Sequence, residues 1–252
     1  CRLLNLHKKV GRHMGTFENK VVMITGAGGG IASGIVSKFA NEGAKLVLVD
    51  RNHDAMQARV DELGDVVSDY LIVGGNLGDP DEVDTIVAQA VEKFGRIDAL
   101  AHTVGGFAAG SPVHETDVSV LEQQFFLNTK ILFITLGRVA KHMVDTGVEG
   151  SIVAILARTG LSGAKNTAAY AASKAAAQRI VESMALELKE HNIRVNGVMP
   201  STADTPANRD AMPNADFDKW VTPEQIGDAI AFLASDAAVA ISGQAIGVYN
   251  KA

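Results

Sequence analysis

The chain has 252 residues, 47% hydrophobic and 21% charged, which suits one α/β domain with a large core. A net charge of −6 without a basic stripe argues against nucleic acid as a partner, and no apolar run reaches the roughly 20 residues of a membrane span. The single cysteine, Cys1, excludes disulfides within the chain and cysteine-based metal sites, so we expect no metal and a reducing compartment, the cytoplasm.

The first residues, "CRLLNLHKKVGRHM", are basic and contain no acid. We interpret 1–15 as a poorly ordered tag or upstream-translated leader, the alternative being a targeting remnant. The fold is then expected as a single domain over 16–252.

From Lys20 onward, short apolar runs alternate with helix-length segments. Strands are predicted over 21–25, 46–50, 70–73, 99–103, 152–156, 195–199 and 245–249, and helices over 31–42, 53–64, 80–94, 117–145, 168–191 and 223–235. Continuous apolar strands alternating with helices predict an open, doubly wound parallel sheet with helices on both faces. Residues from about 201 to 221, rich in proline and turn formers, are predicted to form a loop over the substrate.

A glycine-rich turn follows the first predicted strand, in "VVMITGAGGGIASGIV". Gly26, Gly28, Gly29 and Gly30 would let the backbone approach a pyrophosphate at the start of the next helix. Asp50 ends the second strand, where its carboxylate could bind the ribose hydroxyls of NAD and repel the 2′-phosphate of NADP. The structural alternatives are a tight turn and an ordinary strand-terminal aspartate.

Tyr170 and Lys174 lie one helical turn apart, on one face of a predicted helix. A nearby ammonium favours a phenolate, so we expect Lys174 to lower the pKa of Tyr170 and to make it an acid/base near neutral pH. By itself the pair is also typical of an amphipathic helix with a solvated lysine.

Together the turn 26–32, Asp50, Asn128 and the Tyr170/Ser173/Lys174 group resemble the short-chain dehydrogenase/reductase family, and the resemblance extends over about 20–249. It implies a single Rossmann-type sheet of about seven strands, NAD(H) rather than NADP(H), hydride transfer with a small-molecule substrate, and a homodimer or homotetramer. It also implies that Lys174 holds the nicotinamide ribose and that Asn128 holds a relay water, unless Asn128 is a helix-packing amide. The residues that the resemblance assigns to the cofactor are Gly26, Gly28, Gly29, Gly30, Ile31, Asp50, Asn76, Leu77, Thr103, Gly105, Tyr170, Lys174, Pro200, Thr202 and Thr205.

The chain departs from the family pattern at the position of its catalytic serine, which is Ala157 here. Loss of such a donor typically costs about 10²–10³ in rate. Either another group such as Thr159 substitutes, or the substrate needs less help, or Ala157 is an engineered change, or the protein is an NAD-binding sensor or assembly protein with little catalysis.

Two further departures are His102, which replaces an asparagine and is expected to be buried rather than a base, and Asn76, which replaces an aspartate. Residues 204–220 resemble the corresponding segment of quinoid dihydropteridine reductases, which also lack the serine and suggest a quinonoid substrate. Phe107, Met212, Phe217 and Trp220 are candidates for an apolar lid, the alternative being packing within their loops. Trp220, Ala157 and Thr159 are expected near the substrate.

Overall fold

A computed structural model describes residues 15–67 and 69–251, and in this part of the chain seven strands form one wholly parallel sheet. The expectation for residues 1–15 falls almost entirely outside the described residues. The strands run in the spatial order β3-β2-β1-β4-β5-β6-β7. Their bounds are β1 Val21–Thr25, β2 Lys45–Val49, β3 Tyr70–Val73, β4 Ala99–His102, β5 Ser151–Ile155, β6 Arg194–Pro200 and β7 Ala245–Val248. The predicted doubly wound parallel sheet is therefore confirmed.

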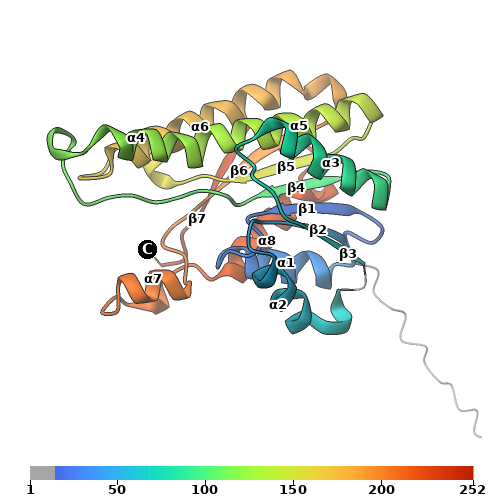
Figure 1. Ribbon diagram of the computed structural model, residues 1–252, viewed down its shortest axis with the longest axis horizontal. Helices are drawn as coiled ribbons and strands as arrows, with labels where there is room; N and C mark the ends of the chain where they lie inside the picture. Colours follow the sequence, from blue (N-terminus) through green and yellow to red (C-terminus); the bar gives the residue numbers. More distant parts are fainter. Residues whose placement is uncertain (1–14, 68, 252) are drawn as a thin grey trace, which may run out of the picture.

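The helices cover both faces of this sheet. Their bounds are α1 Ala32–Asn41, α2 His53–Leu63, α3 Pro80–Phe94, α4 Val118–Phe125, α5 Ile131–Thr146, α6 Ala168–Glu187, α7 Pro206–Ala211 and α8 Pro223–Ala234. Helices α3, α4, α5 and α6 lie on one face, and α1, α2 and α8 on the other (Figure 1). Each face has its own buried apolar cluster, one including Leu136 and Val181 and the other Ile35 and Ile230. None of the described helices is long and apolar enough to cross a membrane.

The predicted elements differ from the observed ones in three places. The long helix expected over 117–145 contains one turn of π-helix, Phe126–Lys130, between α4 and α5. Such turns carry an extra residue and are frequent at functional sites, and this one contains Asn128. The helix expected over 168–191 ends at Glu187, followed by a 3₁₀ turn that stops at Asn192 with a φ of 55°. Finally, the loop over 201–221 contains the short helix α7.

Helices α1 and α8 pack with their backbones in contact. A Cβ atom at Gly34 would lie 2.1 Å from the carbonyl carbon of Pro223, and one at Gly227 would lie 2.7 Å from the carbonyl oxygen of Gly34. Only glycines allow this approach. Because α8 directly follows the loop 201–221, this contact fixes one end of that loop beside the helix that starts at the glycine turn.

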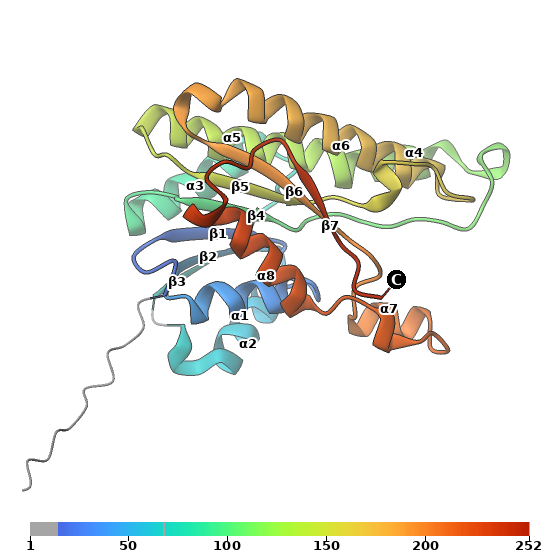
Figure 2. The same cartoon turned by 180° about the vertical axis from the view of Figure 1, so that it is seen from behind.

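The loop 201–221 is closed at its base by pairing between its two ends. Ala203 and Val221 form a parallel bridge, and the Asp204 N–H donates to the Val221 carbonyl over 2.7 Å. Between them, α7 projects from the body of the sheet close to the C-terminal residues (Figure 2). Arg209 donates from Nε and Nη2 to the two carboxylate oxygens of Asp204 over 2.5 and 2.7 Å. This ion pair connects α7 to the base of the loop.

Candidate active site

Most of the predicted site residues line one groove at the carboxyl edge of the sheet. Two cavities of about 300 and 540 Å³ share the lining residues Gly30, Ile31, Thr103 and Gly105 and so form one continuous hollow. The smaller cavity lies beside Asp50, and the larger one reaches Tyr170. Ligands of open α/β sheets bind at this edge. The topology thus brings the glycine turn and the Tyr–Lys pair together.

The glycine turn is packed too tightly for side chains. Gly26 has a φ of +72°, and a Cβ there would lie 2.6 Å from Thr103 Oγ1. A Cβ at Gly30 would lie 3.0 Å from the Thr205 side chain across the groove. Helix α1 begins next to it with no side-chain cap and no acid in its first turn. Its free N–H groups therefore give this end of the groove a positive dipole suited to phosphate.

Arg59 of α2 holds the glycine turn from beneath. Its guanidinium donates from Nε to the Ala27 carbonyl over 3.1 Å and from Nη2 to the Gly29 carbonyl over 3.2 Å. Burial lowers the pKa of Arg59 from its usual value. Sequence reasoning missed this residue, because an arginine on a surface helix carries no local sign of such a contact.

The Asp50 carboxylate lies at the adenosine end that the family resemblance implies. Its Oδ2 accepts from the Gly28 N–H over 3.1 Å, and its Oδ1 accepts from the Asn52 N–H over 3.0 Å. These contacts fix the carboxylate beside the turn and leave lone pairs for further donors. The same cavity is lined by Asn76 and Leu77, as expected, and also by Arg51.

Tyr170 and Lys174 both line the larger cavity from α6. The Phe107 ring packs edge-on against the Tyr170 ring, with centroids 4.9 Å apart and planes at 80°. The Lys174 ammonium donates to the Ile155 carbonyl, at the end of β5, over 3.0 Å. Lysine is buried to 4% exposure here, a rare state that needs such a partner.

The expectation that Lys174 lowers the pKa of Tyr170 is wrong. Burial raises the pKa of Tyr170 to about 12, and burial likewise lowers the pKa of Lys174 to about 8. Desolvation disfavours the charged form of each group, so it raises the pKa of the phenol and lowers the pKa of the ammonium, and the two values move apart. At neutral pH the pair is therefore a neutral phenol beside an ammonium.

Asn128 is 1% exposed and does not line the groove. Its Oδ1 accepts from the Gly106 N–H over 2.9 Å, and its Nδ2 lies within hydrogen-bond distance of Gly106 O, Gln124 Oε1 and Ser173 Oγ. The amide therefore joins the loop after β4 to α4 and α6. This matches the alternative in which Asn128 is a packing amide. The segment that it binds is the loop after β4, which lines the groove.

His102 is buried at the end of β4, as expected. Its Nδ1 lies 2.8 Å from Thr25 Oγ1, while its Nε2 has no hydrogen-bond partner within the described residues. Burial, and secondly the Lys174 charge, lower the pKa of His102 to about 3. The imidazole is thus neutral at physiological pH and does not line the groove.

The larger cavity is lined by Ala157 and Thr159 of the loop after β5 and by Pro200, Thr202 and Thr205 of the segment after β6. The Thr159 hydroxyl is buried and finds no hydrogen-bond partner among the residues that the structure describes. Of the four lid candidates, Phe107 and Met212 line the cavity.

Trp220 lies elsewhere, which corrects the expectation that it contacts the substrate. It is 7% exposed and packs against Phe217 with ring centroids 4.8 Å apart. Its carbonyl accepts a hydrogen bond from Asn250 Nδ2 over 2.7 Å. Trp220 is thus part of the packing of the loop and does not line the groove.

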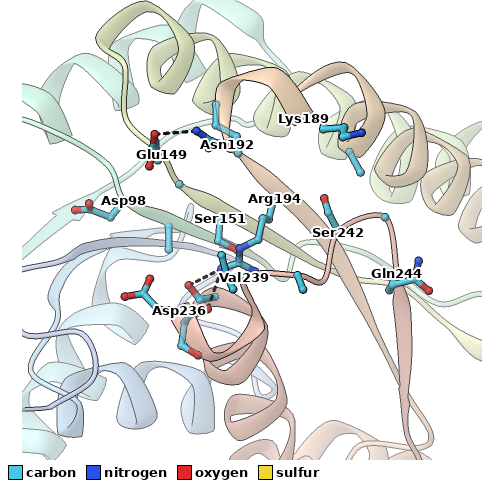
Figure 3. A pocket seen from close by; sticks show the side chains of 18 of the residues that line it. Asp98, Glu149, Ser151, Lys189, Asn192, Arg194, Asp236, Val239, Ser242 and Gln244 are labelled. Carbon is cyan, nitrogen blue, oxygen red and sulfur yellow. Dashed lines mark hydrogen bonds between the residues drawn. The ribbon is translucent and has the colours of Figure 1, made fainter.

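A larger cavity of about 840 Å³ lies at the opposite, amino edge of the sheet (Figure 3). Several of its polar side chains already have hydrogen-bond partners within the protein. Arg194 donates to the Leu233, Ala234 and Ser235 carbonyls at the end of α8, and Asn192 donates to Glu149 over 2.9 Å. None of the predicted site residues lines it. The cavities that the predicted site residues line are the two at the carboxyl edge.

Comparison with known proteins agrees with this geometry. A family model for short chain dehydrogenase matches residues 20–216, so the chain belongs to the short-chain dehydrogenase/reductase family and is an oxidoreductase of that type. L-rhamnose 1-dehydrogenase (NAD(P)(+)) of Sphingomonas sp. (strain SKA58) is 30% identical over 247 residues, which cover 92% of this chain and 96% of that protein.

The 7alpha-hydroxysteroid dehydrogenase of Escherichia coli (strain K12) is 31% identical over 240 residues, covering 92% of this chain and 93% of that protein. A solved structure of a 7α-hydroxysteroid dehydrogenase, complexed with NADH and 7-oxo glycochenodeoxycholic acid, superposes with a TM-score of 0.83 at 30% identity. That superposition covers 93% of this chain and 94% of the other. The relatives' names span a sugar and a steroid, so family membership fixes the class of reaction and not the substrate.

Proposed function

We propose that the chain is an NAD(H)-dependent oxidoreductase that acts on a small carbonyl, carbinol or quinonoid compound with Tyr170 as acid/base. One observation carries this proposal: a phenol and a buried ammonium line the same groove as a glycine turn. The structural alternative, a solvated lysine on an amphipathic helix, does not explain why Lys174 is only 4% exposed. NADP(H) is the less favoured cofactor, because Asp50 lines the adenosine end.

The residues that line the groove fit a dinucleotide. The glycine turn and the start of α1 would hold the diphosphate, and Asp50 the adenosine ribose. Asn76 and Leu77 would contact the adenine, Lys174 the second ribose, and Pro200, Thr202 and Thr205 the nicotinamide and phosphates. When bound, the dinucleotide supplies or accepts a hydride at the carbon that bears the reacting oxygen.

Tyr170 would move the proton. With a pKa of about 12, its phenol keeps its proton at neutral pH and can donate it to the substrate oxygen as that oxygen gains charge during reduction. In the oxidative direction the same oxygen must become a phenolate. The Lys174 ammonium, which shares the cavity, would stabilise that charge.

The methyl group of Ala157 offers no donor where the family has a serine hydroxyl. We propose Thr159 as the substitute, because it lines the same cavity and its hydroxyl is buried without a partner among the described residues. An unpaired buried hydroxyl costs about 1–3 kcal/mol, so a shift of the Thr159 side chain that let a ligand oxygen accept from it would be favourable. A quinonoid substrate, as the likeness of 204–220 to dihydropteridine reductases suggests, would depend less on such a donor.

The test is turnover by Tyr170→Phe in a screen of NADH oxidation with carbonyls, quinones and quinonoid pterins. We expect the rate to fall by two or more orders of magnitude while the Kd of NADH stays within about threefold, since one proton donor typically contributes 10²–10⁴. Unchanged turnover in the variant would contradict the role of Tyr170.

A second candidate is a cofactor-binding sensor or assembly protein with little catalysis, which Ala157 favours. Tight NADH binding with no turnover of any compound in the same screen would support this candidate. The retained phenol and ammonium argue against this candidate. Burying an ammonium costs folding free energy, and a protein without catalysis gains nothing that would offset this cost.

We also propose a homodimer or homotetramer in the cytoplasm. Large apolar side chains are exposed on the outer helices, including Val118 and Leu121 of α4 and Phe133 of α5. Helix faces of this kind commonly mark interfaces between copies of a chain. Sedimentation equilibrium distinguishes monomer, dimer and tetramer.

A further inference from the structure

Arg158 is a cation that the proposed mechanism does not use. It lines the cavity of about 540 Å³ that reaches Tyr170, which is the larger of the two that form the groove. Arg158 follows Ala157 directly, in the short 3₁₀ turn Arg158–Gly160 after β5. It lines the cavity together with Tyr170 and Lys174, and its side chain is exposed. A charged, water-accessible group at this place can meet whatever part of a substrate extends beyond the reacting carbon.

The Arg158 guanidinium is held in place by an aromatic ring. Its central carbon lies 5.3 Å from the centroid of the Tyr249 ring. That ring is itself fixed, because a Cβ at Gly247 would lie 2.6 Å from it and Ser201 Oγ donates to the Tyr249 carbonyl over 3.0 Å. A guanidinium stacked on a ring keeps its N–H edges free to donate to a ligand.

The turn that carries Arg158 is fixed relative to the proton donor. The Gly160 N–H donates to the Ala157 carbonyl over 2.9 Å. A Cβ at Gly160 would lie 3.1 Å from the carbonyl carbon of Lys174, so the turn packs directly on the backbone of α6. The distance between the guanidinium and the Tyr–Lys pair is therefore set by rigid elements and not by a free loop.

The cavity is positive in a chain whose net charge is −6. Among the described residues that line it are two cations, Arg158 and Lys174, and no aspartate or glutamate. Asp204, which lies next to the lining residues Ala203 and Thr205, is paired with Arg209 through the Nε and Nη2 of the guanidinium. Arg158 takes part in no ion pair among residues 15–67 and 69–251. Its charge is thus available to a bound anion.

The rest of the wall carries no charge and combines apolar side chains, among them Phe107, Leu156 and Met212, with neutral polar ones such as Thr205 and Asn208. We propose that the substrate is a carbonyl or carbinol compound that carries a carboxylate, which Arg158 binds while the reacting oxygen meets Tyr170. A single planar guanidinium matches the two oxygens of one carboxylate. The carboxylate is unchanged in the reaction: the carbonyl carbon gains a hydride from NADH, and its oxygen gains the Tyr170 proton. This inference rests on the proposed function and narrows it to anionic substrates.

The experiment compares a series of oxo acids of different length, aliphatic and aromatic, each with its neutral methyl ester. For the preferred pair, we expect the wild-type kcat/KM to be at least tenfold higher for the acid. Arg158→Gln should bring this ratio near one by raising KM for the acid, leaving kcat and the rate with the ester within about threefold. Arg179→Gln, which removes an exposed arginine on α6, is the matched control and should keep the ratio.

A binding measurement gives a second readout. The saturated acid that lacks the carbonyl should inhibit ester turnover by the wild type competitively, and much less by Arg158→Gln. An unchanged acid-to-ester ratio in Arg158→Gln, or a wild type that prefers esters, overturns the inference while the proposed function stands. Equal losses with acid and ester together with weaker NADH binding also overturn it, because the guanidinium would then bind the cofactor. Failure of the wild type to bind NADH and to turn over either form overturns both.

Discussion

The Nζ of Lys174 donates a hydrogen bond of 3.0 Å to the carbonyl oxygen of Ile155, the last residue of β5. This contact fixes an ammonium at the point where the central strands open into the groove. It also explains how a lysine can be buried at all, since the carbonyl replaces one of the water molecules that the ammonium loses. The helix that carries Tyr170 is thereby bound to the end of β5 beside the groove.

The stability contribution of Lys174 should depend on pH. Its pKa is about 8 when folded and near 10.5 when unfolded, so the unfolded chain binds more protons between these values and stability rises with pH across this window. Lys174→Met removes this dependence. Between pH 7 and 10.5 we expect the free energy of unfolding of the variant, relative to wild type, to fall by on the order of 3 kcal/mol.

Urea unfolding of both proteins at pH 7, 8, 9 and 10.5 measures this difference. Lys189→Met, which removes an exposed lysine, should show no comparable trend. A flat difference between Lys174→Met and wild type would mean that the ammonium is solvated in solution.

His102 should make the fold labile to acid. Its imidazole is neutral when folded, with a pKa of about 3, but it gains a proton on unfolding below pH 6.5. The stability present above pH 6.5 is therefore lost as the pH falls toward 3, by on the order of 4–5 kcal/mol. His102→Asn keeps a polar partner for Thr25 and has no imidazole to protonate on unfolding. The free energy of unfolding of this variant, relative to wild type, should therefore rise as the pH falls.

The check is the midpoint of urea unfolding from pH 7 down to pH 4 for wild type and His102→Asn. The exposed His114→Asn is the control and should follow the wild type. Parallel profiles for His102→Asn and wild type would show that the buried ring is protonated in the folded protein.

Asp50 should determine the choice between NAD and NADP. Asp50→Asn removes the charge that would repel a 2′-phosphate while keeping an acceptor for the Gly28 N–H. With Arg51 lining the same cavity, we expect the ratio of kcat/KM for NADH over NADPH to fall by about tenfold or more, which corresponds to about 1.4 kcal/mol. Asp54→Asn, an equal change of charge on α2, should leave the ratio as it is. The same ratio in Asp50→Asn as in wild type would remove Asp50 from the ribose site.

The missing serine gives a prediction on two neighbouring residues. If Thr159 is the substitute donor, Thr159→Val should lower kcat by about 10-fold to 10³-fold, and Ala157→Ser should change it by less than about threefold. Thr167→Val, on the same loop, is the control because its hydroxyl is already bound to the Ala164 carbonyl. A rise of about 10² in Ala157→Ser, with no effect of Thr159→Val, would show instead that the site lacks a donor.

The architecture could be predicted from the sequence because its signals are local. Buried parallel strands are continuous apolar runs, and each predicted strand agrees with an observed one to within one residue at either end. The glycine turn, Asp50 and the Tyr170–Lys174 spacing are also short patterns along the chain. Since all parallel strands end at one edge of the sheet, strand order alone brings these patterns into one groove.

The tertiary structure decided what these groups can do. The pKa of Tyr170 depends on burial by elements such as the loop of Phe107, and this overturned the direction expected from Lys174 alone. The hydrogen bond between Asn128 and Gly106, the one from Asn250 to the Trp220 carbonyl and the position of Arg158 over the Tyr249 ring are likewise contacts between residues far apart in the sequence. Periodicity and spacing describe neighbours along the backbone, whereas desolvation and charge depend on whatever packing brings close in space, and that is fixed only when the whole chain has folded.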